Sequence, residues 1–205
     1  MRISYFGYGS LVNTRTLGED ARATAGTLSG WRREWRAWWP GTPDGAGAPA
    51  PGRVSPCTLT VRRDPASAIR GVLVSEPAER LAVLDKREHR YVRVDGIGEQ
   101  FRCDAQGAPG PGDAFLYEAD SRIRRAGTDA HPILQSYLDC VLAGFLAFWG
   151  EEGVRHFLET TDGWEAPILA DRSAPLYPRA QEIAPDVLAR FDALLAPLEP
   201  RYMAL

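Results

Sequence analysis

The strand-forming and helix-forming patterns of this chain lie in different parts of its sequence. Up to about residue 118, the sequence offers short runs rich in apolar and β-branched residues, separated by Gly and Pro. From Pro132 onward, longer apolar stretches with helical spacing replace them. Strands and helices that do not alternate favour an α+β fold over a doubly wound parallel sheet. No repeat at a fixed period is present, which excludes solenoids and propellers.

Short apolar runs bounded by Gly or Pro locate the expected elements. The aromatic residues of Trp31–Trp39 fit either a helix face or an irregular strand. The segment Arg63-Asp64-Pro65 is typical of a turn between two strands. Residues 40–56 and 105–112 are loops rich in Gly and Pro, and the first is either a functional flap or a disordered insertion. Strands are predicted at Ile3–Phe6, Cys57–Val61, Ile69–Val74, Tyr91–Val94 and Ala114–Tyr117, and helices at Glu76–Glu88, Ile133–Trp149, Gly153–Glu159 and Pro185–Leu195.

The length of the chain bounds its organisation. With 205 residues it forms one large domain or at most two small ones. We expect a single domain over residues 1–205, in which the part from about 120 to 205 is a helical C-terminal extension. A chain of this size buries roughly 70% of its unfolded surface, so it needs no disulfide or metal to hold a core. The sequence indicates no particular oligomeric state.

Charge and cysteine content exclude several classes of protein. The 24 basic and 27 acidic residues give a net charge of −3 without a basic block, which argues against a nucleic-acid partner. The three cysteines form no CxxC pair, so neither a zinc knuckle nor a disulfide framework is available. The apolar run Val141–Trp149 is about half of the ~18 residues that a membrane span requires. The N-terminus lacks the apolar core of a secretory signal, so we expect a cytoplasmic protein without a membrane partner.

A glutamate extends the apolar face of the helix predicted before residue 88. Leu81, Leu84 and Glu88 are spaced i, i+3, i+7 and share one helical face, whereas Arg87 and Arg90 are expected to point elsewhere and stay hydrated. A carboxylate on a buried stripe is costly unless it is hydrogen-bonded or used in chemistry. Because burial raises a carboxyl pKa, Glu88 is a candidate general base. The alternative is that Glu88 ends the helix and reaches solvent or pairs with an arginine.

A glycine turn, Gly7-Tyr8-Gly9-Ser10, follows the first predicted strand. Glycines there let backbone N–H groups face a ligand closely, which is typical of an anion-binding nest. The segment is neither a Walker loop, because GK[ST] is absent, nor a dinucleotide fingerprint, because a third glycine is missing. The alternative is an ordinary tight turn.

Other potential sites are few. Tyr137 lies among polar residues of the long predicted helix and offers a hydroxyl in front of an apolar body, or else caps the core as a boundary tyrosine. The three histidines lack the i, i+4 spacing of a helical metal pair, so we expect no metal site. No GxSxG is present, which leaves an α/β-hydrolase elbow without support.

Together these segments resemble the gamma-glutamylcyclotransferase superfamily. Residues 6–11 (FGYGSL) resemble its YGSL-type loop, and residues 84–88 (LDKRE) followed by Tyr91 resemble its L-D-x-R-E…Y segment. Residues 71–73 lie where the family has the strand that enters the catalytic helix, and residues 132–144, with Tyr137, resemble its C-terminal helix. The similarity spans roughly residues 3–145. Residues 12–13 (VN) stand where the glutathione-specific branch carries a bulkier Ile-Trp pair, which disfavours that branch of glutathione metabolism.

The resemblance implies an α+β fold in which a mixed sheet curls into a small barrel flanked by helices. It implies that the α-amine of a gamma-glutamyl group attacks the group's own γ-carbonyl, giving 5-oxoproline and a released amine, amino acid or peptide. Neither metal nor cofactor takes part in that reaction. Glu88 would be the catalytic proton-transfer carboxylate and Tyr137 would offer a catalytic hydroxyl. The substrate-binding residues would be Tyr8, Gly9, Ser10 and Leu11 of the turn, together with Tyr91, which would offer its hydroxyl to the site.

Three hypotheses remain from the sequence. The first is an enzyme of this transferase or lyase type whose partner is a small gamma-glutamyl molecule. The second is a non-catalytic module that binds a carboxylated metabolite on the same scaffold. The third is an unrelated α+β domain in which both motifs are coincidental turns and caps. A Glu88 carboxylate far from the 8–11 turn would support the third, because one small substrate must reach both.

Overall fold

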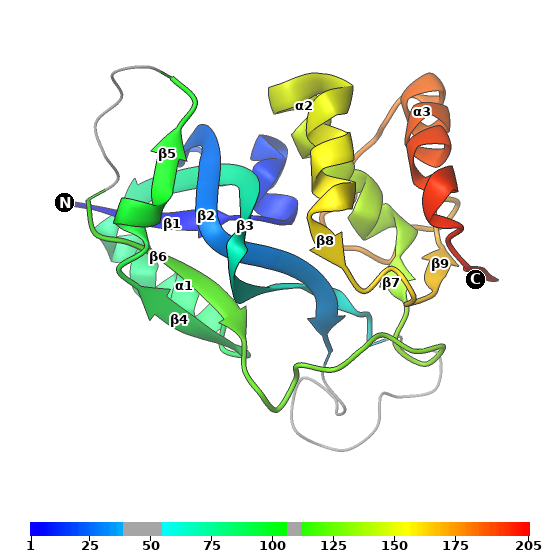
Figure 1. Cartoon of the computed structure of the whole chain (residues 1–205), viewed down its shortest axis with the longest axis horizontal. Helices are drawn as coiled ribbons and strands as arrows, with labels where there is room; N and C mark the ends of the chain where they lie inside the picture. The colour runs from blue at the N-terminus through cyan, green and yellow to red at the C-terminus, as the bar shows by residue number, and fades with distance from the viewer. Residues whose placement is uncertain (39–54, 106–111) are drawn as a thin grey trace.

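A mixed β-sheet with helices beside it forms the frame of the computed structural model, which describes residues 1–38, 55–105 and 112–205 (Figure 1). Within these residues the sheet has seven strands in the order β4-β6-β1-β3-β2-β5, with β8 paired to β2. The order runs from β4 to β5 without closing on itself, and a three-stranded sheet, β10-β9-β7, lies near the C-terminus. The strands are β1 (Arg2–Gly7), β2 (Arg22–Ala37), β3 (Thr58–Pro77), β4 (Tyr91–Asp95), β5 (Phe101–Cys103), β6 (Ala114–Ala119), β7 (Ile133–Leu134), β8 (Thr161–Asp162), β9 (Ile168–Ala170) and β10 (Tyr202–Ala204).

The helices follow the predicted order with shifted boundaries. The first, α1, starts only after a 3-10 turn (η3, Ala78–Arg80), because β3 continues to Pro77 in order to pair with Arg2 of β1. The helices predicted at Ile133–Trp149 and Gly153–Glu159 are joined into α2, with a kink at Gly150, where φ is 63°. The last helix coincides with its prediction, and α2 and α3 lie next to each other (Figure 1). The helices are α1 (Leu81–Arg87), α2 (Gln135–Glu159) and α3 (Pro185–Leu195), and the other 3-10 turns are η1 (Ser10–Val12), η2 (Thr14–Thr16), η4 (Gly98–Gln100) and η5 (Ala196–Leu198).

The predicted turn at Arg63-Asp64-Pro65 is wrong, because β3 continues through it. Ser29 of β2 pairs with Ala68 and Trp31 pairs with Arg63, so the extra residues of β3 form an irregular bulge opposite Gly30. The Asp64 side chain holds the bulge through the N–H of Ala66 at 3.2 Å and the hydroxyl of Ser67 at 2.9 Å. These residues therefore make the local hydrogen bonds typical of a turn, but they bend a long strand instead of ending it.

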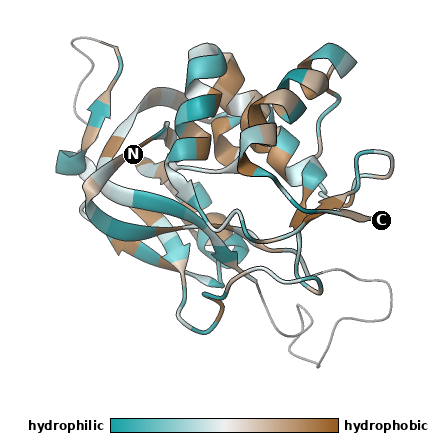
Figure 2. Ribbon diagram, turned by 45° about the vertical axis from the view of Figure 1, so that its right-hand side comes forward, coloured by the Kyte–Doolittle hydropathy of each residue, from teal (hydrophilic) through white to brown (hydrophobic). Residues whose placement is uncertain are grey.

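One apolar core joins the sheet to the helices. Trp31 and Trp35 of β2 are fully buried, and Phe145 and Phe157 of α2 and Phe191 of α3 belong to the same cluster. Each such side chain contributes roughly 1.5–3 kcal/mol through burial. Hydrophobic segments occupy the strands and the helix sides that face one another (Figure 2). The α+β class, with a mixed sheet flanked by helices, is confirmed.

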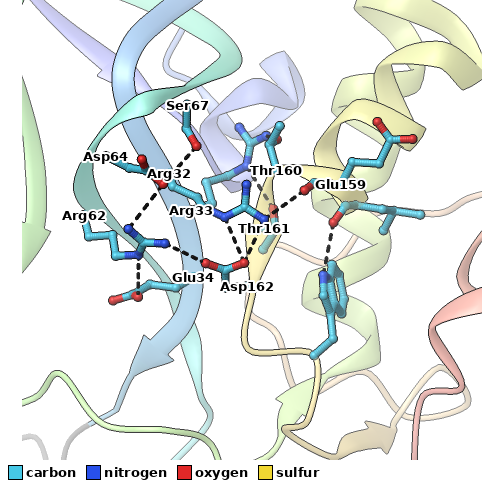
Figure 3. A network of polar contacts seen from close by, with 12 residues as sticks. Arg32, Arg33, Glu34, Arg62, Asp64, Ser67, Glu159, Thr160, Thr161 and Asp162 are labelled. Atoms are coloured by element: carbon cyan, nitrogen blue, oxygen red, sulfur yellow. Dashed lines mark hydrogen bonds and ion pairs between the residues drawn. The ribbon is translucent and has the colours of Figure 1, made fainter.

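A polar network fastens the end of α2 to the sheet (Figure 3). Arg33 of β2 is fully buried and donates to the hydroxyls of Thr160 and Thr161 at 2.5 and 3.1 Å. Burial lowers the pKa of Arg33 to about 9. Nearby, Asp162 accepts hydrogen bonds from Arg32 and Arg62 at 2.8 and 3.0 Å. These contacts fix the direction in which α2 crosses the sheet.

In the part of the chain that the structure describes, no helix is long and apolar enough to cross a bilayer.

Candidate active site

A cavity of about 440 Å³ lies where β1, β4, β6 and α2 meet the C-terminal segment. Its wall takes in the carboxylate candidate, the glycine turn and the tyrosines that the sequence singled out. Because the turn and the carboxylate candidate share this cavity, the reading in which both motifs are coincidental loses its support. The predicted site residues that line it are Tyr8, Gly9, Ser10, Leu11, Glu88, Tyr91 and Tyr137.

The glycine turn forms the inner wall of this cavity. Gly9 precedes η1, and a Cβ there would lie 3.1 Å from Tyr137 Oη and 3.3 Å from Leu59 Cδ1. The absence of a side chain thus allows the backbone to approach the tyrosine. The N–H groups of Ser10 and Leu11 open a 3-10 turn, and among the described residues they have no acceptor within that turn. These are the donors of the anion-binding nest that the sequence predicts, which stays a prediction.

Helix α2 holds the turn in place from behind. A Cβ on Gly144 would lie 2.4 Å from the backbone nitrogen of Asn13, so α2 and the residues after η1 are in backbone contact. The Asn13 side chain donates to the carbonyl oxygen of Cys140 at 3.1 Å and accepts from the N–H of Arg15 at 3.2 Å. The turn is therefore rigidly placed relative to α2.

Glu88 lies at the end of α1, where its side chain is 23% exposed. The predicted burial is thus partial, with Leu84 buried and Leu81 half-buried on the same face. The expectation that Arg87 points away is wrong. Its Nε donates to Glu88 Oε1 at 2.8 Å, and both Arg87 and Arg90 line the cavity. The short α1 ends at residue 87, so these side chains turn toward the cavity with Glu88.

Three of the predicted tyrosines line the cavity together with Glu88. Tyr8 Oη donates to the carbonyl oxygen of Tyr117 at 2.6 Å, and Tyr91 Oη donates to that of Leu59 at 3.1 Å. Tyr137 packs edge-on against Trp35, with ring centroids 5.8 Å apart. Burial raises the pKa of the phenols of Tyr8, Tyr91 and Tyr137, which therefore stay protonated. Of the three hydroxyls, that of Tyr91 makes the most contacts with the sheet, because it also lies 2.9 Å from the Thr58 hydroxyl of β3.

The segment after β9 contributes two residues that the sequence did not indicate. The Tyr177 ring lies 4.9 Å from that of Tyr137, and the Arg179 guanidinium donates to Ser10 Oγ at 3.2 Å. Both residues line the cavity. They lie in an irregular stretch between two helices, where no period or motif marks them. A Tyr-Pro-Arg sequence in a proline-rich tail is the one local signal, and it is weak.

A buried carboxylate anchors this segment. Asp171 is fully buried and accepts from the N–H and the hydroxyl of Ser136 at 2.8 and 2.6 Å. It also accepts from the N–H of Leu176 at 2.9 Å, and Ser136 Oγ accepts from the N–H of Tyr177 at 3.3 Å. Because Ser136 directly precedes Tyr137, one network places side chains from both α2 and the tail.

An aromatic stack borders the cavity on its remaining side. The rings of Trp38 and His131 lie 3.6 Å apart and nearly parallel. Trp38 lines the cavity together with Ser55 and Pro56. The predicted flap at 40–56 falls mostly on residues 39–54, which lie outside the described residues. Within the described ranges, no group of three or more His, Cys, Asp or Glu side chains is placed to hold a metal ion.

Comparison with known proteins bears on the fold. The sequence matches no protein-family model and no curated protein sequence. The structure is similar to one described as a gamma-glutamyl cyclotransferase, with a TM-score of 0.56 and 13% identity over 94% of this chain and 99% of the other. An uncharacterized protein from Homo sapiens gives a TM-score of 0.56 at 13% identity, over 93% of this chain and 98% of the other.

A third solved structure extends the likeness. YkqA from Bacillus subtilis gives a TM-score of 0.51 at 19% identity, over 79% of this chain and 56% of the other. At such identities a structural match shows the fold and leaves activity open. The chain has the gamma-glutamylcyclotransferase-like fold that its short motifs predict.

Proposed function

We propose that this protein is a gamma-glutamylcyclotransferase-like enzyme that releases 5-oxoproline from a small gamma-glutamyl compound. The observation that carries the proposal is the shared cavity of Glu88 and the 8–11 turn, which one small substrate can fill. A general acid/base must lie within hydrogen-bond reach of the atoms that exchange protons. The fold of the solved gamma-glutamyl cyclotransferase supports the same proposal.

Glu88 carries the proton transfers in this mechanism. The α-ammonium group of the substrate cannot attack until it loses a proton, which the Glu88 carboxylate accepts. The free amine then attacks the γ-carbonyl carbon, a C–N bond forms, and a negative charge develops on the carbonyl oxygen. When the bond to the leaving nitrogen breaks, Glu88 gives that nitrogen the proton it had accepted, and it then takes the extra proton of the ring nitrogen and passes it to the released amine. The products are 5-oxoproline and the released amine.

The rest of the cavity holds the substrate folded. Because the attack is intramolecular, orientation supplies much of the rate enhancement. The N–H groups of Ser10 and Leu11 would bind an anionic oxygen, either of the substrate carboxylate or of the carbonyl as it becomes negative. Tyr137, which remains a neutral phenol, would donate a further hydrogen bond to the substrate.

The second candidate is a binding module without turnover, and the Arg87–Glu88 pair favours it. A carboxylate already held by a guanidinium at 2.8 Å is well placed to organise a binding site without exchanging protons. Such a module would bind a carboxylated ligand and leave it unchanged.

The experiment is a 5-oxoproline release assay on a panel of gamma-glutamyl amines, gamma-glutamyl amino acids and glutathione. Glu88→Gln keeps the shape of the side chain and removes the base. Glu79→Gln is the matched control, since Glu79 is exposed and precedes the same helix. Release that disappears only in Glu88→Gln supports the enzyme, whereas full activity in that variant refutes the role of Glu88. Tight binding without release identifies the binding module.

A further inference from the structure

The cavity contains a cation whose role the proposed reaction does not explain. Arg179 lines it from the C-terminal segment, and in the described part of the chain no carboxylate is paired with its guanidinium. Arg87, by contrast, is matched by Glu88. A guanidinium beside a ligand cavity, without an acidic partner of its own, is suited to a carboxylate that arrives with the ligand.

The contacts of Arg179 with the described residues leave most of its donors unused. A guanidinium has five N–H donors, and within these residues one of them is donated to Ser10 Oγ at 3.2 Å. The Tyr177 ring supports the guanidinium at 5.6 Å from its centroid. Through its bond to Ser10, the guanidinium lies next to the 8–11 turn, whose N–H groups would also donate to a ligand. Side chain and backbone thus offer donors to the same anion.

The backbone that carries Arg179 is fixed before any ligand binds. The N–H of Ala180 donates to the carbonyl oxygen of Tyr177 at 3.0 Å, and Gln181 Nε2 donates to that of Arg179 at 3.0 Å. Upstream, Asp171 and Ser136 hold the same segment against α2. A donor held in place in this way loses little conformational freedom on binding, which favours affinity.

We propose that Arg179 is a specificity-determining residue that binds a carboxylate of the substrate at the Ser10 end of the cavity. The proposal rests on the proposed function for the identity of the substrate. The carboxylate is either the α-carboxylate of the glutamyl group or that of a released amino acid. In both cases compounds that lack it are poor ligands.

A pair of small probes tests the carboxylate contact without any turnover. 5-Oxoproline and 2-pyrrolidinone share one ring and differ in the carboxylate. Calorimetric titration of the wild-type protein should show at least tenfold tighter binding of 5-oxoproline. In Arg179→Gln this preference should fall to about twofold, with 2-pyrrolidinone binding unchanged, and Arg179→Lys should give an intermediate value because a point charge replaces the fork.

Controls separate a local contact from charge and folding effects. Arg190→Gln removes one positive charge from an exposed position on α3 and should leave the preference intact. Thermal melting of each variant checks that the fold is retained. A preference that survives in Arg179→Gln overturns the proposal, and so does equal binding, or no binding, of the two probes by the wild-type protein. Equal loss of both probes in Arg179→Gln also overturns it, because it indicates a structural role.

Three substrates then identify which carboxylate is bound. Gamma-glutamylalanine carries both carboxylates, gamma-glutamylethylamide carries only the α-carboxylate, and 4-aminobutyrylalanine carries only that of the released alanine. If Arg179→Gln increases the KM of the ethylamide, the carboxylate that Arg179 binds is the α-carboxylate. If KM increases only for the two alanine compounds, Arg179 binds the carboxylate of the released alanine. If the wild-type protein turns over none of them, the proposed function fails, and the probe titrations still decide the role of Arg179.

Discussion

Asp171 and Ser136 are joined by two hydrogen bonds, at 2.8 Å from the Ser136 N–H and 2.6 Å from its hydroxyl, across 35 residues of sequence. The pair lies behind the candidate active site and touches none of the reacting groups. These bonds, with the one from the Tyr177 N–H to Ser136 Oγ, hold the segment that leads to Tyr177 against the first turn of α2. The shape of the cavity therefore depends on a fully buried carboxylate outside its wall.

Asp171→Ala should destabilise the protein and weaken the site together. The substitution leaves the buried N–H group of Ser136 without an acceptor, which costs about 1–3 kcal/mol, and it also removes the partner of the part-buried N–H group of Leu176. Urea unfolding measures the loss, and titration with 5-oxoproline measures the site. Asp20→Asn, at an exposed position, is the control and should change neither. Unaltered stability of Asp171→Ala would contradict the anchoring role.

Tyr137→Phe should reduce activity in part and preserve the fold. The ring and its packing against Trp35 remain, while one hydrogen bond to the substrate is lost. Such a bond contributes about 1 kcal/mol, equivalent to a roughly fivefold decrease in kcat/KM. Steady-state kinetics on the best gamma-glutamyl substrate provides the measurement, with Tyr202→Phe as an exposed control. Unchanged kinetics would assign Tyr137 to packing alone.

Gly144→Ala should be far more harmful than Gly18→Ala. At position 144 the added Cβ would lie 2.4 Å from the backbone nitrogen of Asn13, whereas at position 18 it would lie 3.6 Å from a flexible arginine tip, Arg80 Nη2. Relieving the first clash requires α2 and the turn to separate, which costs roughly 1–3 kcal/mol. Thermal unfolding compares the two variants. Equal melting temperatures would show that the contact between α2 and the turn can relax freely.

Stability should fall as the pH decreases from about 6.5 to about 4, with His156 as one cause. Burial, followed by the charges of Arg33 and Arg70, lowers the pKa of His156 to about 4. In the unfolded chain a histidine titrates near pH 6.5. Between these values the unfolded state binds a proton that the folded state does not, so the free energy of unfolding rises with pH. Below about pH 4 both states are protonated and this contribution levels off.

His156→Gln isolates that effect from the titration of carboxylates. Urea unfolding at pH 5 and pH 7 should show a smaller difference between the two pH values for His156→Gln than for the wild-type protein. His89→Gln, at an exposed position, is the matched control and should resemble the wild type. If His156→Gln retained the full pH dependence, the protonation of His156 would play no part in it.

Local patterns predicted the elements that local interactions decide. The boundaries of α3 follow from a proline in its first turn and from Phe191 and Leu195, which lie one turn apart on its buried face. The aromatic stretch after Trp31 could not be assigned, because its spacing fits two periods. Pairing with β3 decides for a strand, and that pairing is not visible in β2 alone.

In the candidate site, too, local motifs predicted some residues, and contacts between distant parts of the sequence decide the others. Short motifs located Glu88, the glycine turn and Tyr137, which all line the cavity. Arg179 escaped prediction because Ser10, its hydrogen-bond partner, is 169 residues away and the tail around it has no period. For Glu88, the structure shows the alternative in which it ends the helix and pairs with an arginine, and only the direction of that arginine was misjudged. A helical wheel places Arg87 to one side, but α1 ends at residue 87 and the wheel no longer applies there.

The distance in sequence between Ser10 and Arg179 also has a consequence for biosynthesis. Ribosomes add ~5–20 residues each second, so 169 residues separate the emergence of these two side chains by roughly 10–30 s. Once residue 88 has been added, a nascent chain carries the glycine turn and Glu88 for the rest of that interval, but not the guanidinium that meets Ser10. The cavity can acquire its complete wall only after residue 179 has been added, whatever the rate at which the sheet forms.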